Sequence, residues 1–365
     1  FSFFEGIRQL KQKLKDDVLI VVVAPILWIQ TIKEFKTKPL QNSVKELQKY
    51  GLQPDVIFCR TDRDVPNKIL DKISMMTGVK KENLIEAVDV QSIYQVPIEF
   101  YDRQVDDLFV DLLRFKRSSC RIHKYREIVE KYMKPDLKKI KIGIIGKYDN
   151  CDEAYISLKE SLVHAGIAND VKVEIEWIKS DLLEKTKDVK EILSSLNGVI
   201  VPGGFDSRGV EGKIKAIKYC RENNVPFLGI CLGLQTAVIE FARNVCEMKN
   251  ANSMEFEKTP EFPVVYYIEG QQSLKTKSAN MRLGSYECEL TKESLAFNAY
   301  KSKLINERHR HRFEINPLYL DKYKEHGFQV TGSNPQTGLV EIMELTSHKF
   351  FVGVQFHPEY KSRLQ

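Results

Sequence analysis

No stretch of this sequence is apolar for long enough to cross a lipid bilayer. The most hydrophobic run, residues 18–29, contains Pro25 and falls short of the roughly 20 residues that a transmembrane helix requires. The N-terminal residues also show no signal-peptide pattern. We therefore expect no membrane partner and a cytoplasmic location.

Paired cysteines and long blocks of like charge are missing as well. The seven cysteines have neither C-x-x-C nor metal-ligand spacing, which favours reduced cytosolic thiols over disulfides or a zinc site. The net charge of +6 comes from 56 basic and 50 acidic residues. Because phosphorylated small molecules explain this modest excess as well as nucleic acid does, we expect no nucleic-acid partner.

The length of 365 residues, 42% of them hydrophobic, is sufficient for two hydrophobic cores. Residues 1–118 predict one α/β domain, and the basic, helical segment 119–139 predicts a linker. Residues 140–365 alternate strands with helices, which predicts a doubly wound, mainly parallel sheet whose site lies at the carboxyl ends of its strands. Because the chain begins with Phe1 and ends soon after residue 359, we expect a fragment or the ordered part of a longer protein.

The predicted elements are the following. In the first domain we expect helices at 3–14 and 42–50 and strands at 18–23 and 55–59. In the second we expect strands at 140–146, 171–178, 198–201 and 225–230, and helices at 155–165, 189–196 and 213–223 and from residue 232 onward.

A cysteine lies where the last of these strands meets the last helix. The sequence Gly229-Ile230-Cys231-Leu232-Gly233 is a cysteine form of the G-x-S-x-G nucleophile elbow, in which small residues permit a sharp turn. The positive end of the following helix favours the thiolate, which is the attacking species. Taken alone, the motif leaves open a buried cysteine that only packs.

A second motif, FFVGVQFHPEY at 350–360, supplies a base. It predicts a strand that ends at His357, with Glu359 two residues later on the same face of an extended backbone. A cysteine nucleophile needs an imidazole to hold its proton, and the imidazole needs a carboxylate to fix its tautomer. A surface turn is the alternative for this motif alone, but together the motifs favour a catalytic triad of Cys231, His357 and Glu359.

The loop after the strand at 198–201 reads Pro202-Gly203-Gly204-Phe205. We expect it near Cys231, because the carboxyl ends of parallel strands share one edge of a sheet. The backbone N–H groups of Gly204 and Leu232 are then the predicted donors to the oxyanion of a tetrahedral intermediate. A plain turn is the alternative for the glycine pair.

These motifs resemble those of the class I glutamine amidotransferases, whose Cys-His-Glu triad releases ammonia from glutamine. Further segments resemble the CTP synthase family within that class: PGGF with SRGVEGKIKAI from 202, NANSMEF at 250–256, MRLG at 281–284, ERHRHRFEIN at 307–316, VEIMEL at 340–345 and KTKPLQNSVKEL at 36–47. The resemblance covers nearly the whole chain. It implies a ligase that uses L-glutamine, UTP and ATP to make CTP, passing ammonia from a glutaminase site to a synthetase domain.

The resemblance also implies roles for individual residues. The α-amino group of glutamine would contact Glu255, and its α-carboxylate would contact Arg310. The substrate would also contact Gly204, Phe205 and Gln235. UTP would contact Lys36, Lys38, Gln41 and Lys72, and GTP a lid that includes Arg282 and Arg208. Before Pro39 we expect an extended segment in which Lys36 and Lys38 face the same way; a solvated basic loop is the alternative.

Two positions depart from the family pattern, since Leu40 stands where threonine is usual and Asp206 where glycine is usual. The phosphate-binding loop of the synthetase domain has no counterpart, because residues 143–148 lack its spacing. We therefore assign no metal ligand, and expect these residues alone to release glutamate but form no CTP. The resemblance implies Mg²⁺ and ATP bound outside them, GTP as activator, and a homotetramer with filaments as a further assembly.

Three alternatives remain. Another class I amidotransferase, such as one serving GMP synthesis, is disfavoured by the segment 36–47. A catalytically silent nucleotide-sensing or assembly module is disfavoured by the intact triad. A cysteine redox sensor would need only an acidified thiol, so the glutamate partner of the histidine argues against it.

Overall fold

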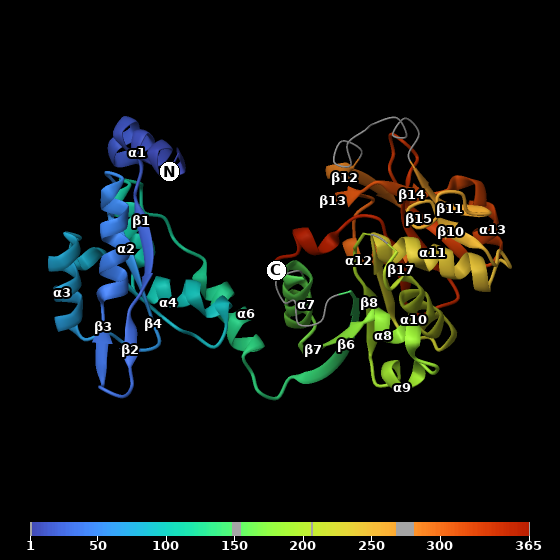
Figure 1. Ribbon diagram of the computed structural model, residues 1–365, viewed down its shortest axis with the longest axis horizontal. Coiled ribbons are helices and arrows are strands. Elements are labelled where there is room, and N and C mark those ends of the chain that lie inside the picture. Colours follow the sequence, from blue (N-terminus) through green and yellow to red (C-terminus); the bar gives the residue numbers. More distant parts are fainter. Residues whose placement is uncertain (1, 148–154, 206, 268–280, 365) are drawn as a thin grey trace. The chain divides into compact units, whose positions relative to one another are not determined.

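The computed structural model describes residues 2–147, 155–205, 207–267 and 281–364. The chain forms two compact units, residues 1–133 and 134–365 (Figure 1). The boundary falls inside the segment predicted as a linker. Within that segment, α6 (Ile122–Tyr132) packs Ile122 and Val129 against Ile98 of α4. Residues up to 133 therefore belong to the first unit.

The first unit is built on a three-stranded parallel sheet in the order β1-β4-β5. Leu40 and Val44 of α2 and Ile73 of α3 pack on its central strand through Ile57. Its elements are α1 (Ser2–Leu14), β1 (Val21–Pro25), the hairpin β2 (Leu27–Ile29) and β3 (Glu34–Lys36), α2 (Lys38–Lys49), β4 (Val56–Thr61), α3 (Asn67–Thr77), β5 (Leu84–Val88), α4 (Val96–Asp102), α5 (Val105–Leu112) and α6. Two helices and two strands were thus predicted, with shifted ends.

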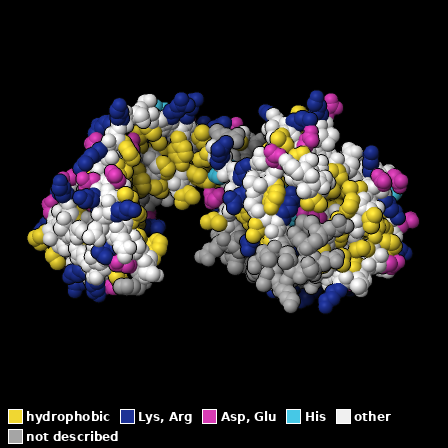
Figure 2. All heavy atoms as spheres, turned by 90° about the horizontal axis from the view of Figure 1, so that it is seen from above, with side chains coloured by type: hydrophobic (Ala, Val, Ile, Leu, Met, Phe, Trp, Pro, Cys, Tyr) yellow, Lys and Arg dark blue, Asp and Glu magenta, His cyan; other side chains and the backbone are white. Residues whose placement is uncertain are grey.

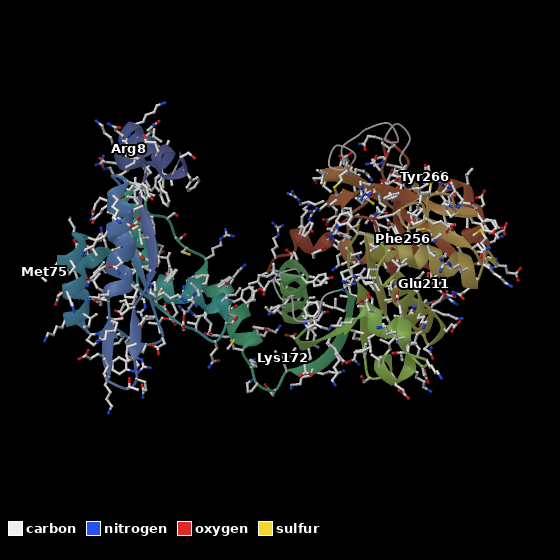
Figure 3. The ribbon with its side chains drawn as sticks, in the orientation of Figure 1. Arg8, Met75, Lys172, Glu211, Phe256 and Tyr266 are labelled. Carbon is white, nitrogen blue, oxygen red and sulfur yellow. The ribbon has the colours of Figure 1, made fainter. Side chains whose placement is uncertain are left out.

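Apolar side chains are exposed on the surface of the first unit (Figure 2). Val23, on the edge strand β1, is 69% exposed, and Met75 of α3 is 77% exposed (Figure 3). Among the described residues β1 pairs only with β4, so its other edge has no neighbouring strand there. In the described ranges, no helix has both the length and the apolar character that crossing a membrane would require.

The second unit contains a nine-stranded sheet in the order β13-β12-β15-β16-β17-β9-β8-β6-β7. The strands from β17 to β7 run parallel, and those from β13 to β17 run antiparallel. The strands are β6 (Lys138–Gly146), β7 (Val171–Lys179), β8 (Gly198–Val201), β9 (Phe227–Ile230), β12 (Arg282–Leu290), β13 (Leu304–His311), β15 (Phe328–Ser333), β16 (Val340–Leu345) and β17 (Phe351–Val354). The α/β fold class is confirmed; the strand–helix alternation predicted the parallel half but not the antiparallel one.

Helices cover both faces of the parallel half, as a doubly wound sheet requires. On β8, Val199 and Val201 point into the cluster that holds α10 and α11, while Ile200 points into the cluster that holds Leu158 of α7. The helices are α7 (Ile156–Ala168), α8 (Ser180–Lys185), α9 (Lys190–Leu193), α10 (Val210–Glu222), α11 (Leu232–Asn244), α12 (Leu295–Tyr300) and α13 (Leu320–Glu325). A small sheet of β10 (Ala251–Ser253), β11 (Phe262–Tyr267) and β14 (Phe313–Ile315) adjoins α11.

Candidate active site

Cys231 occupies the turn between β9 and α11, as predicted. Its backbone has φ 53° and ψ −102°, a conformation that is strained for a residue with a side chain. The flanking glycines make this turn possible. A Cβ on Gly229 would lie 2.6 Å from the carbonyl carbon of Gly233, and a Cβ on Gly233 would collide with the carbonyl oxygen of Val201. Close packing of β8, β9 and α11 therefore holds the cysteine at the sheet edge.

His357 and Glu359 are in direct contact, although the predicted backbone was wrong. The strand β17 ends at Val354, and His357 is the N-cap of a 3₁₀ turn, Pro358–Lys361. Proline suits the first position of such a turn because the missing N–H is not needed there. Within this turn Nδ1 of His357 lies 2.7 Å from Oε1 of Glu359. The two side chains meet through a tight turn and not through an extended strand.

The imidazole of His357 lies beside Cys231 in the wall of the same cavity, which brings the three residues of the triad together. Burial lowers the pKa of His357, but hydrogen bonds to Cys231 and Glu359 and their negative charges outweigh this and raise it to about 10. Gly203 leaves room for the pair, since a Cβ there would lie 2.6 Å from Cε1 of His357 and 3.5 Å from Cβ of Cys231. The structure thus favours an imidazolium beside the sulfur.

The triad opens into a cavity of about 300 Å³. Gly204 follows β8 and Leu232 follows β9, and a Cβ on Gly204 would lie 3.3 Å from Cδ2 of Leu232. The two residues predicted as oxyanion donors therefore adjoin each other beside Cys231. The donation itself stays a prediction. The cavity is lined by Cys231, His357, Gly203, Gly204, Phe205, Arg310, Lys147, Tyr155, Lys213 and Tyr360.

A smaller recess continues from Cys231. Gln235 of α11 and Glu255, which follows β10, both line it, as do Gly204 and Phe205. Sequence analysis missed Arg312, which lines the same recess with its Nη2 4.0 Å from Oε1 of Glu255. A carboxylate and a guanidinium thus lie side by side in the recess next to Cys231.

Arg310 lies on the exposed face of β13, with its guanidinium carbon 5.9 Å from the ring centre of Phe205. The strand alternates exposed and buried residues, so Arg310 points toward the cavity while its neighbours His309 and His311 are buried. Arg312 follows the end of β13, where alternation along a strand no longer predicts the direction of a side chain. That ambiguity explains why the arginine-rich motif alone did not distinguish the two residues.

Other basic groups surround the cavity. Lys213 of α10 is only 1% exposed, and its Nζ would lie 3.9 Å from a Cβ on Gly204. Lys147 donates a hydrogen bond to the carbonyl oxygen of Phe205. Lys213 lies within the quoted SRGVEGKIKAI segment, but its burial could not be read from the sequence. With Arg310, these side chains give the cavity a positive character that suits an anionic intermediate.

The two residues predicted for a GTP lid are placed differently. Arg282 is buried on β12, where its guanidinium donates to Glu314 at 3.3 Å and to Glu341 at 2.6 Å. Its burial leaves it little surface for a nucleotide. Arg208 is exposed and donates to Asp181 at 3.1 Å. Asp206 lies outside the described residues.

Three of the predicted UTP residues, Lys36, Lys38 and Gln41, lie around the start of α2, and Lys72 lies on α3. The extended segment expected before Pro39 was wrong, because Thr37 has φ −97° and ψ −3° and Lys38 begins the helix. Proline is tolerated there since N–H groups of the first turn have no partner within the helix. The side-chain Nε2 of Gln41 donates to Oγ1 of Thr37 at 2.9 Å.

Two of the predicted UTP lysines act on one carboxylate. Nζ of Lys36 lies 2.7 Å from Glu34, and this hydrogen bond, with the charge of Lys72 as a lesser cause, lowers the pKa of Glu34. Leu40 is fully buried in the core of the first unit, so its departure from threonine is a packing change. Within the described ranges no group of three or more metal-binding side chains is present.

Comparison with known proteins supports this assignment. Residues 1–115 match the family model for the CTP synthase N-terminus, and residues 151–365 match that for glutamine amidotransferase class-I. The CTP synthases of Methanocaldococcus jannaschii and Methanococcus maripaludis are 43% and 45% identical over 368 residues, covering 99% of this chain and 68% of theirs.

Among solved structures, the glutaminase domain of Trypanosoma brucei CTPS with bound acivicin is 36% identical. It matches with a TM-score of 0.58 over 61% of this chain and 88% of that one. Taken together with the Cys-His-Glu site on the nucleophile elbow, these matches establish that the chain belongs to the CTP synthase family.

Proposed function

We propose that this chain hydrolyses L-glutamine at Cys231 and supplies the ammonia for amination of UTP to CTP, with ATP as the energy source. The observation that carries the proposal is the contact of Cys231, His357 and Glu359 at the mouth of one cavity. Strain at the elbow and burial of the pair are typical of a prepositioned nucleophile. The family match of both units supports the coupling to CTP formation.

The first half-reaction forms a thioester. The Sγ of Cys231 attacks the carboxamide carbon of glutamine, and the oxygen that becomes negative accepts hydrogen bonds from the N–H groups of Gly204 and Leu232. The imidazolium of His357 gives its proton to the departing nitrogen, so that the C–N bond breaks and ammonia leaves. Glu359 holds the imidazole in place and stabilises its positive charge.

The second half-reaction restores the enzyme. His357, now neutral, takes a proton from water as the oxygen attacks the thioester carbon, and the C–S bond breaks to release glutamate and the Cys231 thiolate. The imidazolium and thiolate are thereby returned together. The raised pKa of His357 favours this resting state.

The amino-acid end of glutamine would bind in the smaller recess. Glu255 would accept hydrogen bonds from the α-amino group, and Gln235 and Phe205 would line the site. The sequence predicted Arg310 as the partner of the α-carboxylate, but because Arg312 lies in the recess beside Glu255 we propose Arg312 as the partner in preference to Arg310. A carboxylate next to an arginine complements the opposite charges of a free amino acid.

The remaining assignments rest on the family. UTP would bind Lys36, Lys38, Gln41 and Lys72. GTP would act as an activator through a lid that includes Arg208, whereas Arg282, predicted for the same lid, is buried and is assigned no GTP contact. The family uses ATP, and Mg²⁺ would accompany it; we assign no residue of this chain to the metal. The family also implies a cytoplasmic homotetramer that is able to form filaments. The six cysteines among the described residues are free thiols.

A covalent trap tests the glutaminase site directly. Acivicin, an electrophilic glutamine analogue, should add one equivalent to the peptide that contains Cys231, as read by mass spectrometry, and glutamine in excess should protect it. Cys220→Ala is a matched control because Cys220 is buried away from the cavity, and its variant should label normally. Labelling of other cysteines with Cys231 unmodified would contradict the proposal.

A further inference from the structure

Two histidines lie buried on β13, directly behind the catalytic cavity. His309 and His311 are 3% and 2% exposed. The backbone of the same strand contacts the triad: the carbonyl oxygen of Arg308 accepts from the N–H of His357 at 2.8 Å, and that of Arg310 lies 3.9 Å from Sγ of Cys231. Anything that orders this strand therefore bears on the active site.

The carbonyl oxygen of Phe313 determines which nitrogen of His311 carries a proton. This oxygen lies 3.1 Å from Nδ1 of His311, and a carbonyl can only accept, so Nδ1 must be protonated. Glu314 Oε1, at 3.5 Å from the same nitrogen, is a second acceptor. In a neutral imidazole the other nitrogen, Nε2, is then an acceptor.

The same logic extends to His309. Its Nδ1 lies 2.9 Å from Nε2 of His311, so a neutral pair requires His309 also to carry its proton on Nδ1. The Nε2 of His309 is then left with a lone pair, and it faces Oε2 of Glu341 at 3.5 Å. Neither atom has a hydrogen-bond partner within the described part of the chain. A proton on Oε2 turns this contact from repulsive to attractive.

The other groups around Glu341 also favour a proton on its Oε2. Its Oε1 accepts from Arg282 of β12 at 2.6 Å, which leaves Oε2 for the proton. Burial raises the pKa of Glu341 to about 7 against the opposing charge of Arg282, and burial lowers the pKa of His309 to about 3. Burial likewise lowers the pKa of His311. Among the described residues, the other titratable neighbours are Tyr286 and Cys288 of β12, Glu314 of β14 and His357.

The far end of this chain of groups reaches the glutamine recess. Gln235 donates its Nε2 to the carbonyl oxygen of Phe313 at 3.0 Å and to Oε1 of Gln355 at 3.3 Å. With the amide nitrogen so occupied, Oε1 is the atom with which Gln235 can accept a hydrogen bond from a ligand. The orientation of Gln235 thus depends on the carbonyl that His311 also binds.

We propose that Glu341, His309 and His311 form a directional hydrogen-bond chain, from the Glu341 carboxyl to the Phe313 carbonyl, which positions Gln235 for glutamine. The three are positioning residues, since none lines the cavity at the triad and only His311 borders the recess. What Gln235 contacts rests on the proposed function, whereas the hydrogen-bond chain does not. The hydrogen-bond chain is intact while Glu341 is protonated, and it breaks when Glu341 loses that proton.

NMR of ¹⁵N-histidine-labelled protein tests the hydrogen-bond chain without an activity assay, because it reports which ring nitrogen of each histidine carries the proton. At pH 6 both His309 and His311 should be neutral with the proton on Nδ1, the less common tautomer in water, and His309→Asn and His311→Asn variants assign the signals. At pH 9 His309 should carry its proton on Nε2 instead. An Nε2–H tautomer or an imidazolium for either residue at pH 6 would refute the proposal, even if glutaminase activity is confirmed.

Variants of Glu341 test the consequence. In Glu341→Gln the amide can donate to His309 and accept from Arg282, so the tautomers should stay unchanged to pH 9 and the KM for glutamine should stay within about threefold. In Glu341→Leu the KM should rise at least about tenfold with a smaller change in kcat, because the chain ends at the recess and not at Cys231. Equal KM values in both variants would overturn the positioning role. If the Glu341→Leu variant does not fold, a change of the histidine tautomers in Glu341→Gln at pH 9 would overturn it instead.

Discussion

Cys231 and His357, the predicted nucleophile and base of the second unit, are buried and held by neighbouring strands, whereas the predicted nucleotide-binding lysines of the first unit are exposed. Cys231 and His357 are fixed by backbone contacts and by each other. Lys36 instead pairs with Glu34 on the surface, and Lys38 projects from the first turn of a helix. Bond-making needs atoms fixed to within a fraction of an ångström, while attraction of a triphosphate by lysines tolerates motion.

This comparison predicts that substitutions in the two units differ in kind as well as in size. Changes in the second unit should alter turnover, because they remove groups that act on the transition state. Changes at the lysines should alter nucleotide affinity by modest factors and leave glutamine chemistry unaffected.

The largest effect should come from the nucleophile. Cys231→Ala should lower glutamine hydrolysis by at least about 10³-fold, because the sulfur forms the covalent intermediate. Release of glutamate measured by a coupled assay checks this, and circular dichroism checks that the fold is retained. Cys288→Ala, at another buried cysteine, should retain most activity. Substantial turnover in Cys231→Ala would remove the sharpest contrast between the units.

The orienting carboxylate should come next. Glu359→Gln should reduce kcat about 10²-fold or more with little change in KM, since it removes the charge that supports the imidazolium in the transition state. The loss of that charge should also lower the pKa of His357 from about 10, which shifts the pH profile of kcat/KM to lower pH. Glu307→Gln is a matched control, because Glu307 is buried and bonded to Tyr300. A change confined to KM would contradict the role of Glu359.

The two arginines of the arginine-rich motif should differ at the level of substrate binding. Arg312→Leu should raise the KM for glutamine about tenfold, because Arg312 lies beside Glu255, and Arg310→Leu should have the smaller effect on KM. Steady-state kinetics over a range of glutamine concentrations distinguishes them. A larger KM effect for Arg310→Leu would assign the α-carboxylate of glutamine to Arg310, as the sequence predicted.

In the first unit the effect should be smaller. Lys38→Ala should weaken UTP binding by about three- to tenfold in calorimetry and leave glutamine hydrolysis unchanged, since one exposed lysine contributes modestly to a triphosphate site. Lys49→Ala is the control, because Lys49 lies at the other end of the same helix and pairs with Glu46. Unchanged UTP affinity in Lys38→Ala would make this lysine a solvated basic residue at the start of α2 with no role in UTP binding.

The smallest effect concerns stability. Burial raises the pKa of Glu314 to about 8, well above its value in an unfolded chain. The folded state therefore favours the protonated acid, and this group makes the protein less stable as pH rises from about 5 to 8. Glu314→Gln should remove that part of the slope when melting temperatures of the variant and the parent are compared at several pH values. Parallel curves of melting temperature against pH for the variant and the parent would show that Glu314 is ionised in the folded protein throughout this pH range.

Local motifs predicted the triad because its chemistry is encoded over short distances in the chain. The elbow needs glycines immediately around Cys231, and His357 and Glu359 are two residues apart, so their contact survived a wrong backbone prediction. Arg282 was different. Its partners Glu314 and Glu341 lie on other strands, and only the pairing of the sheet showed that it is buried between them.

The sequence by itself determined the fold class and predicted the nucleophile and its base, because hydrophobic periodicity and a strained elbow are properties of consecutive residues. Only the tertiary structure decided which arginine lies beside Glu255, that Lys213 is buried at the cavity, and that two histidines lie between Glu341 and the Phe313 carbonyl. These relations join strands and helices far apart in the chain. Their geometry depends on sheet order and register, which no short stretch of sequence specifies.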